Sequence, residues 1–203
     1  MFKKKPDLNL KYTESSFVFN DIEYNNSDVK SISYMEGRFD LHVIAHGTDS
    51  SYGAWMVLDM NDGEVVTIRE KTKPSGRKEI VEQIRNFYFE ISELTYTQRS
   101  KQYHDQVKKK GYFLYCNYKF FPEEKYIQSP HTNNNVFELK KYNFVKHYDG
   151  DIEIRLKNPS IIETIKRKSL FLKGRPGFPT VRDRDVIFTL LKHYLNLSWS
   201  KNK

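Results

Sequence analysis

Apolar residues at alternating steps of four and three predict one amphipathic helix near the middle of the chain. The stripe consists of Ile80, Ile84, Phe87, Ile91 and Leu94, which share one face of a helix with 3.6 residues per turn. The opposite face carries charged and amide side chains, namely Glu79, Glu82, Arg85, Asn86, Glu90 and Glu93. Because a helix of this length is stabilised mainly by packing, we expect the stripe to be buried against the strands that precede it.

The apolar stripe stops after Leu94. Thr95 and Thr97 have low helix propensity, and five basic residues oppose one acid, Asp105, between Arg99 and Lys110. We interpret residues 99–110 as a basic linker or a projecting extension of the helix. The boundary between two units is therefore expected in this segment.

Short alternating segments separated by turn residues predict strands in the first half of the chain. These segments cover residues 8–12, 16–19, 22–24, 29–35, 38–46, 54–60 and 64–69. The last two flank Asn61-Asp62-Gly63, a strong signal for a β-hairpin. A meander of antiparallel strands is expected before the helix.

The second half repeats this plan. Residues 112–121 are apolar on both faces over much of their length, which predicts a central or covered strand. Residues 136–147 and 152–156 flank a second Asp-Gly hairpin signal at residues 148–151, and residues 169–172 form a last candidate strand. A final helix is expected from Asp183 or Asp185. Its apolar residues are Val186, Ile187, Leu190, Leu191, Tyr194 and Leu195.

The sequence thus predicts an α+β protein with two antiparallel β-rich units, each closed by a C-terminal amphipathic helix. We place the first unit at residues 1–98, the basic linker or helix extension at 99–110 and the second unit at 111–203. The similarity between the halves lies in their plan and not in their residues, so a true duplication stays an open alternative.

The successive strands of the first half resemble the pleckstrin-homology-like fold found in small bacterial domains. The resemblance rests on residues 17–24, 28–32 and 55–66, followed by the helix, and it is clearer in the first half than in the second. It implies a tandem of such domains that acts as a binding or scaffold module, because these domains rarely carry catalysis. The ligand does not follow from the fold.

Composition and charge indicate a folded protein with an anionic partner. Charged residues make up 30% and aromatic residues 15% of the chain, and the formal net charge is +8, which favours an acidic protein, an anionic membrane surface or nucleic acid as partner. Solubility is the alternative explanation of the charge. Cys116 is the single cysteine, and neither a signal peptide nor a stretch of transmembrane length is present, so we expect a cytoplasmic protein.

Two basic Pro/Gly loops that precede the helices are the predicted partner-binding sites. The first gathers cations beside the free N–H groups of the helix start, with Ser75 as the expected N-cap. The candidate residues are Lys71, Lys73, Ser75, Gly76, Arg77 and Lys78 in the first loop, and Lys173, Arg175, Arg182 and Arg184 in the second. The residues 99–110 offer a third basic surface. If the loops bind nothing, they are solvated turns.

Enzymatic chemistry finds little support in the sequence. His42 and His46 lie on one predicted strand about 13 Å apart, too far to share a metal ion. Glu123, Glu138 and Lys140 resemble the metal-binding motif of the PD-(D/E)xK nuclease family, but a glutamate replaces the usual aspartate and a hairpin replaces the usual helix. The alternative function is therefore a metal-dependent nuclease or a nucleic-acid-binding protein.

We expect a non-catalytic intracellular binding or scaffold module, of bacterial or phage origin, that needs no cofactor. It would dock an acidic protein or an anionic membrane surface through its basic loops, and nucleic acid is the less favoured partner. A dedicated protein-partner module, such as an immunity protein or phage-encoded inhibitor, is a further alternative. The motifs for nucleotide and dinucleotide binding and for serine hydrolases are absent.

Overall fold

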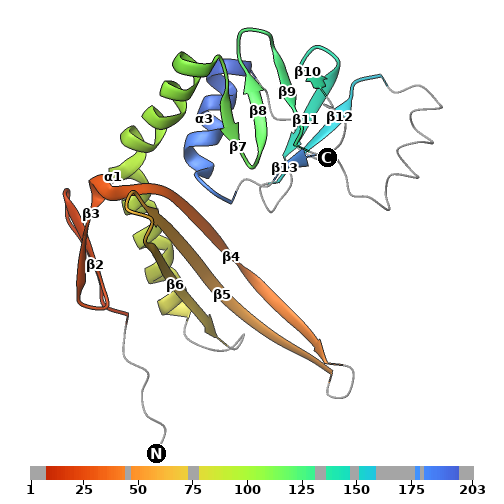
Figure 1. Cartoon of the computed structure of the whole chain (residues 1–203). Helices are drawn as coiled ribbons and strands as arrows, with labels where there is room; N and C mark the ends of the chain where they lie inside the picture. The colour runs from red at the N-terminus through yellow and green to blue at the C-terminus, as the bar shows by residue number, and fades with distance from the viewer. Residues whose placement is uncertain are drawn as a thin grey trace, which may run out of the picture. The chain divides into compact units, whose positions relative to one another are not determined.

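The computed structural model describes residues 8–43, 47–72, 78–130, 136–146, 151–158, 177–178 and 181–196. The chain forms two compact units, Met1–Arg99 and Ser100–Lys203. Each unit combines helix with strands, and every strand pair in the described residues is antiparallel (Figure 1). The predicted α+β class is confirmed.

Two three-stranded sheets make up the β structure of the first unit. Strands β1 (Leu10–Tyr12), β2 (Ser16–Phe19) and β3 (Ile22–Asn25) form one sheet in this order, and the short 3-10 helix η1 (Asn26–Asp28) comes next in the chain. Strands β4 (Val29–Val43), β5 (Gly47–Met60) and β6 (Val65–Thr72) form the other. The predicted separation of residues 29–35 from 38–46 is wrong, because β4 pairs with β5 continuously through Gly37.

The hairpin between β5 and β6 is confirmed. Its tight turn is closed by hydrogen bonds from the Met60 N–H to the Glu64 carbonyl oxygen at 2.9 Å and from the Gly63 N–H to the Met60 carbonyl oxygen at 3.2 Å. Gly63 has a φ of +94°, a left-handed value that glycine adopts without steric cost. The Asn-Asp-Gly sequence therefore fixes the register of the two strands.

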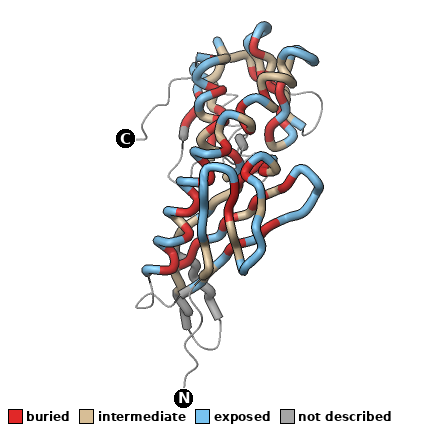
Figure 2. The backbone as a smooth tube through the Cα atoms, turned by 90° about the vertical axis from the view of Figure 1, so that its left-hand side faces the viewer, coloured by how far each residue is buried: buried red, intermediate tan, exposed pale blue. Residues whose placement is uncertain are grey.

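Helix α1 (Lys78–Lys110) packs its apolar stripe onto the β4-β5-β6 sheet. Ile80, Ile84, Phe87 and Ile91 are buried in one core cluster with the inward residues of these strands and with Phe17 of β2. Figure 2 shows this buried side along the helix. The expected burial is confirmed for these four residues, whereas Leu94 is 36% exposed. The inward position one residue later is taken by Thr95, which is fully buried.

Helix α1 continues beyond Leu94 because polar side chains take over its buried side. The Thr95 hydroxyl donates to the Ile91 carbonyl oxygen at 2.6 Å. Arg99 is also 0% exposed; its Nε donates to the Thr95 hydroxyl at 3.0 Å and a terminal nitrogen donates to the Ser92 carbonyl oxygen at 2.8 Å. Residues 99–110 are thus helical, and Arg99 cannot present its charge to a partner as the third basic surface would require.

Four short strands open the β structure of the second unit. They are β7 (Phe113–Tyr115), β8 (Tyr118–Phe121), β9 (Tyr126–Gln128) and β10 (Val136–Glu138), in the order β10-β9-β8-β7. The single strand predicted over residues 112–121 is wrong. Cys116 and Asn117 both have positive φ, +47° and +65°, so they form a tight hairpin turn without the glycine that usually marks one.

A smaller sheet and a helix complete the described part of the second unit. Strands β11 (Tyr142–Lys146), β12 (Ile152–Leu156) and β13 (Gly177–Phe178) form the sheet. The expected pairing across residues 148–151 is confirmed by the Lys146–Ile152 register, although residues 148–150 of that turn and residues 169–172 lie outside the described residues. The segment 136–147 is two strands, not one, because residues 139–141 turn the chain.

The C-terminal helix α3 (Arg184–Leu195) confirms the predicted helix. The apolar residues Val186, Ile187, Leu190, Leu191 and Leu195 are buried, and Tyr194 is half-buried. Its N-cap is Asp183, whose side chain makes no capping hydrogen bond. Neither α1 nor α3 has a stretch long and apolar enough to cross a membrane, and no other helix in the described residues does.

Candidate functional site

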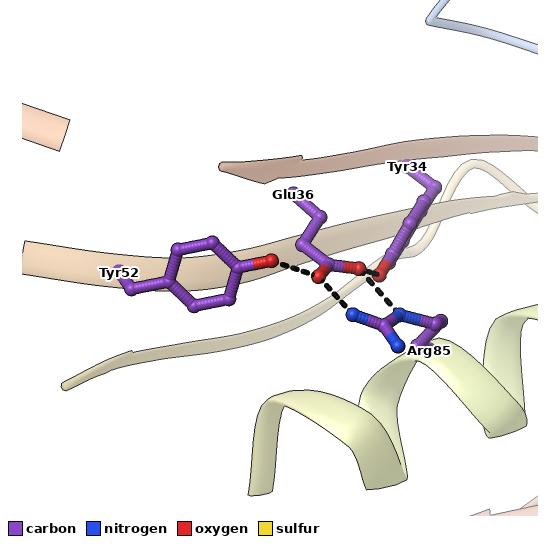
Figure 3. Close-up of polar contacts among 4 residues, drawn as sticks. All are labelled: Tyr34, Glu36, Tyr52 and Arg85. Atoms are coloured by element: carbon purple, nitrogen blue, oxygen red, sulfur yellow. Dashed lines mark hydrogen bonds and ion pairs between the residues drawn. The ribbon is translucent and has the colours of Figure 1, made fainter. Parts of the chain in front are cut away.

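A polar cluster lies on the inner face of the β4-β5-β6 sheet, where the sheet meets α1. It consists of Tyr34 and Glu36 from β4, Tyr52 from β5 and Arg85 from α1 (Figure 3). Successive residues of a strand point to opposite faces, so Tyr34 and Glu36 face the helix and Met35 between them faces outward. We call these four residues the Glu36 clamp.

The carboxylate of Glu36 accepts hydrogen bonds from the other three members of the clamp. Arg85 donates from Nε to Oε2 at 2.8 Å and from a terminal nitrogen to Oε1. The Tyr34 hydroxyl donates to Oε2 at 2.5 Å, and the Tyr52 hydroxyl donates to Oε1. The Tyr34 ring also stacks on Tyr88 of α1, with 4.3 Å between ring centroids. The clamp therefore ties two strands to the helix.

The electrostatics of the clamp make Glu36 a poor catalyst. Hydrogen bonds from Arg85, opposed by partial burial and reinforced by both tyrosines, lower the pKa of the Glu36 carboxyl to about 2. Burial and the neighbouring carboxylate raise the pKa of Tyr34. A carboxylate with so low a pKa is ionised but a weak base at neutral pH. The clamp is thus suited to hold α1 on the sheet and not to transfer protons.

The outer face of the same sheet exposes a row of three side chains. Met35, Trp55 and Arg69 are direct cross-strand neighbours on β4, β5 and β6. Met35 is 39% and Trp55 44% exposed, and Arg69 is exposed. The same face carries three further exposed residues of β6. We call the whole set the Trp55 face: Met35, Trp55, Val65, Thr67, Arg69 and Lys71.

The residues predicted for the first basic loop fall on both sides of an undescribed segment. Lys71 is exposed in β6, on the Trp55 face, and Lys78 is the first residue of α1. Lys73, Ser75, Gly76 and Arg77 lie outside the described residues, and so the expected Ser75 cap stays a prediction. The structure adds Arg69, two positions before Lys71, to the cations of this region.

The residues predicted for the second basic loop belong to the other unit. Lys173 and Arg175 lie outside the described residues. Arg182 is exposed just before α3, whereas Arg184 is half-buried as the first residue of that helix. In the described part of this loop, Arg182 is therefore the more exposed of the two cations.

The two carboxylates considered for a nuclease lie in different elements, and one of them contacts two lysines. Glu123 is exposed in the turn between β8 and β9. Glu138 ends β10 and contacts two lysines, with 2.6 Å from Oε1 to the Nζ of Lys141 and 3.3 Å from Oε2 to the Nζ of Lys140. Among the residues that the structure describes, no group of three or more His, Cys, Asp or Glu side chains could hold a metal ion. His42 lies in β4, and His46 is outside the described residues.

The second unit has its own buried polar cluster beneath α3. The Tyr103 hydroxyl donates to the buried carboxylate of Asp183 at 2.8 Å, and the Tyr115 hydroxyl donates to the Arg182 carbonyl oxygen at 2.6 Å. Burial raises the pKa of the neighbouring Cys116 thiol, which disfavours the nucleophilic thiolate. These contacts join α1, β7 and the start of α3, and we assign them a structural role.

Sequence reasoning missed the Glu36 clamp and the outward Trp55. In the sequence, Glu36 belongs to a Glu-x-Arg pattern, which charged chains contain by chance. Arg85 is one of several polar residues on the face of the helix opposite the apolar stripe. The alternation of residues along the strands could have revealed both. Glu36 lies on the same face of β4 as Tyr34, whereas Trp55 lies on the face of β5 opposite to that of the inward residues Ala54 and Met56. A charged residue at an inward position and a large aromatic at an outward one both point to a specific contact.

Comparison with protein-family models, with curated proteins and with solved structures finds no match to this chain.

Proposed function

We propose that this protein is a non-catalytic binding module that docks an acidic protein partner on the Trp55 face. The observation that carries the proposal is the pair of exposed cations, Arg69 and Lys71, at alternate positions of β6. Alternate residues of a strand lie about 7 Å apart on one face. The chain runs from Lys71 directly into residues 73–78, which add Lys73, Arg77 and Lys78.

The contacts of two carboxylates, Glu36 and Glu138, are compatible with a binding role. Glu36 is fully engaged by donors, and Glu138 is engaged by Lys140 and Lys141. The resemblance to tandem pleckstrin-homology-like domains also favours binding over catalysis. Two antiparallel sheets followed by a helix in the first unit are compatible with that resemblance, which stays a prediction.

An anionic membrane surface and nucleic acid are the competing partners. Both would use the same cations, and a nuclease would in addition need Glu123 and Glu138 to bind a metal ion. An acidic protein fits the Trp55 face better, because the cations are bordered by Met35, Trp55, Val65 and Thr67, a mixed apolar and polar surface typical of protein interfaces.

Charge reversal tests the proposal. The probe is a fluorescent peptide of alternating glutamate and serine, titrated with the full chain at low salt. Replacing Arg69 and Lys71 together by glutamate should weaken binding by about tenfold or more, while the melting temperature stays almost unchanged because both side chains are exposed. A second variant, with Lys73, Arg77 and Lys78 changed to glutamate, tests the loop in the same way.

The matched control changes the net charge equally at another place. Lys108→Glu with Lys109→Glu alters two exposed lysines at the end of α1, and this variant should bind the peptide within about threefold of the wild-type chain. Equal losses in the control and the β6 variant would mean that only the overall charge matters, and the proposal of a docking site on β6 would be wrong.

A further inference from the structure

Trp55 is the most unusual residue of the sheet's outer face. A large aromatic side chain lies 44% exposed on the central strand, between Met35 on one neighbouring strand and Arg69 on the other. Trp, Met and Arg are the residue types enriched in protein interfaces, and Trp and Arg dominate binding hot spots. The row therefore has the composition of an interface centre.

The residues behind this row hold Trp55 in place. Its chain neighbours Ala54 and Met56 are buried in the core cluster, and Ala54 is the cross-strand partner of Glu36. The clamp that fixes Glu36 to α1 thus lies directly beneath the row. An indole on a fixed backbone loses little conformational entropy when a partner covers it.

The rest of the face distinguishes between possible partners. Bases of single-stranded nucleic acid stack on successive aromatic side chains, but the direct cross-strand neighbours of Trp55 on this face are Met35 and Arg69, which are not aromatic. The other exposed residues are apolar or uncharged at Met35, Val65 and Thr67, and the cations Arg69 and Lys71 lie together at one edge strand. This arrangement fits a polypeptide with an apolar side chain next to carboxylates.

We propose that Trp55 and Met35 form an anchor site for a large apolar side chain of the acidic partner, whose neighbouring carboxylates pair with Arg69 and Lys71. This inference rests on the proposed function, since it names the partner's recognition element at the same face. The apolar contact supplies affinity, and the cations select an acidic segment.

A double-mutant cycle between peptide and protein tests the anchor. One 11-residue probe, Ser-Glu-Ser-Glu-Ser-Leu-Ser-Glu-Ser-Glu-Ser, carries a central leucine with glutamates on both sides, so that either chain direction can bind. The other probe has serine in place of the leucine. The wild-type chain should bind the leucine peptide about tenfold more tightly than the serine peptide, and Trp55→Ser should remove this preference. Retention of the preference in Trp55→Ser would overturn the anchor proposal.

Two further variants separate the anchor from general effects. A Cβ atom at Gly37, on the outer side of β4 two residues from Met35, would meet nothing within 4 Å, so Gly37→Tyr should fold and obstruct the face, lowering affinity for the leucine peptide. Phe89→Ser removes an exposed aromatic from α1 instead and should leave the preference for leucine intact. If Phe89→Ser abolishes the preference as well, the site is not on the sheet.

The Arg69→Glu, Lys71→Glu chain distinguishes the two proposals. If this chain binds both peptides as tightly as the wild-type chain, the proposed function fails together with the anchor. If it binds both weakly while Trp55→Ser keeps the leucine preference, the charged docking site stands and the anchor alone is wrong. Tighter binding of oligo-dT or of phosphatidylserine vesicles than of the leucine peptide, lost in Trp55→Ser, would overturn the anchor in favour of that partner.

Discussion

Glu36 should make the stability of the first unit dependent on acid pH. The folded chain lowers the pKa of this carboxyl from 4.5 to about 2, so its stabilising contribution is present above about pH 5 and is lost as the pH falls towards 2. Because Glu36 is only 13% exposed but Arg85 is 41% exposed, we discount the pair for solvent screening and expect a contribution on the order of 2 kcal/mol.

Glu36→Gln should therefore reduce the free energy of unfolding by about 1–3 kcal/mol at pH 7. The difference from the wild-type chain should shrink as the pH falls from 5 to 2, as measured by urea denaturation at a series of pH values. Glu79→Gln changes an exposed acid on α1; it is the control and should alter the free energy of unfolding little. A constant difference at all pH values would mean that the carboxylate's charge is not the source of the clamp's stability.

At the scale of single residues, apolar periodicity predicted the core positions of the helix, but it missed contacts between residues that are far apart in the sequence. Ile80, Ile84, Phe87 and Ile91 were placed correctly because spacing alone defines their face. The Glu36–Arg85 pair joins residues that are 49 positions apart, and no local pattern links them. They meet only when β4 and α1 pack together.

At the scale of elements, two of the errors share a physical cause, which is that polar residues occupy positions expected for other residue types. Helix α1 continues past Leu94 because Thr95 and Arg99 are buried with hydrogen-bonding partners inside the helix. The β7-β8 turn uses Cys116 and Asn117 in left-handed conformations instead of glycine. Patterns of apolarity and glycine cannot reveal either feature, whereas the Gly63 turn fits the usual pattern and was predicted.

The side chain of Gln98 should be needed to hold the middle of α1 against η1 and the start of β4. Its Nε2 donates to the carbonyl oxygens of Asn26 at 2.5 Å and Val29 at 2.9 Å, which join the helix to η1 and the start of β4. Gln98→Ala removes both hydrogen bonds and should lower the free energy of unfolding by about 1–2 kcal/mol. Denaturant titration followed by circular dichroism measures the change.

Thr97→Ala is the matched control for Gln98, because Thr97 is exposed on the adjacent position of the same helix. It should change the free energy of unfolding by less than about 0.5 kcal/mol. Equal effects of the two substitutions would show that the side-chain bonds of Gln98 contribute nothing beyond helix propensity.

At the scale of the whole molecule, composition predicts an anionic partner, which stays a proposal, and it does not locate the surface that would contact this partner. The net charge of +8 is dispersed over the chain, and one of the cations expected on a contact surface, Arg99, is wholly buried. Alternation along β6 is what gathers Arg69 and Lys71 on the face that also holds Trp55. The location of the proposed site therefore depends on which face of the strand each cation lies on and on whether it is buried, and the net charge reveals neither.

On the Trp55 face, the proposed roles of the cations and of Trp55 predict how salt changes the rates of binding. Long-range attraction by the cations speeds association and is screened as the Debye length falls to about 10 Å at 0.1 M salt, whereas an apolar contact with Trp55 mainly slows dissociation. Raising NaCl from 25 to 250 mM should lower the association rate of the leucine peptide about tenfold and change its dissociation rate by less than about twofold, as measured by stopped-flow fluorescence.

Two variants of equal net charge decide whether this attraction is local. Arg69→Gln with Lys71→Gln should flatten the salt dependence of the association rate, whereas Lys108→Gln with Lys109→Gln should reduce it only slightly, because these lysines lie at the end of α1 and not on β6. Trp55→Ser should leave the association rate and its salt dependence unchanged and raise the dissociation rate. If salt instead raised the dissociation rate as strongly as it lowered the association rate, the bound state would be held by charge alone, and Trp55 would have no anchoring role.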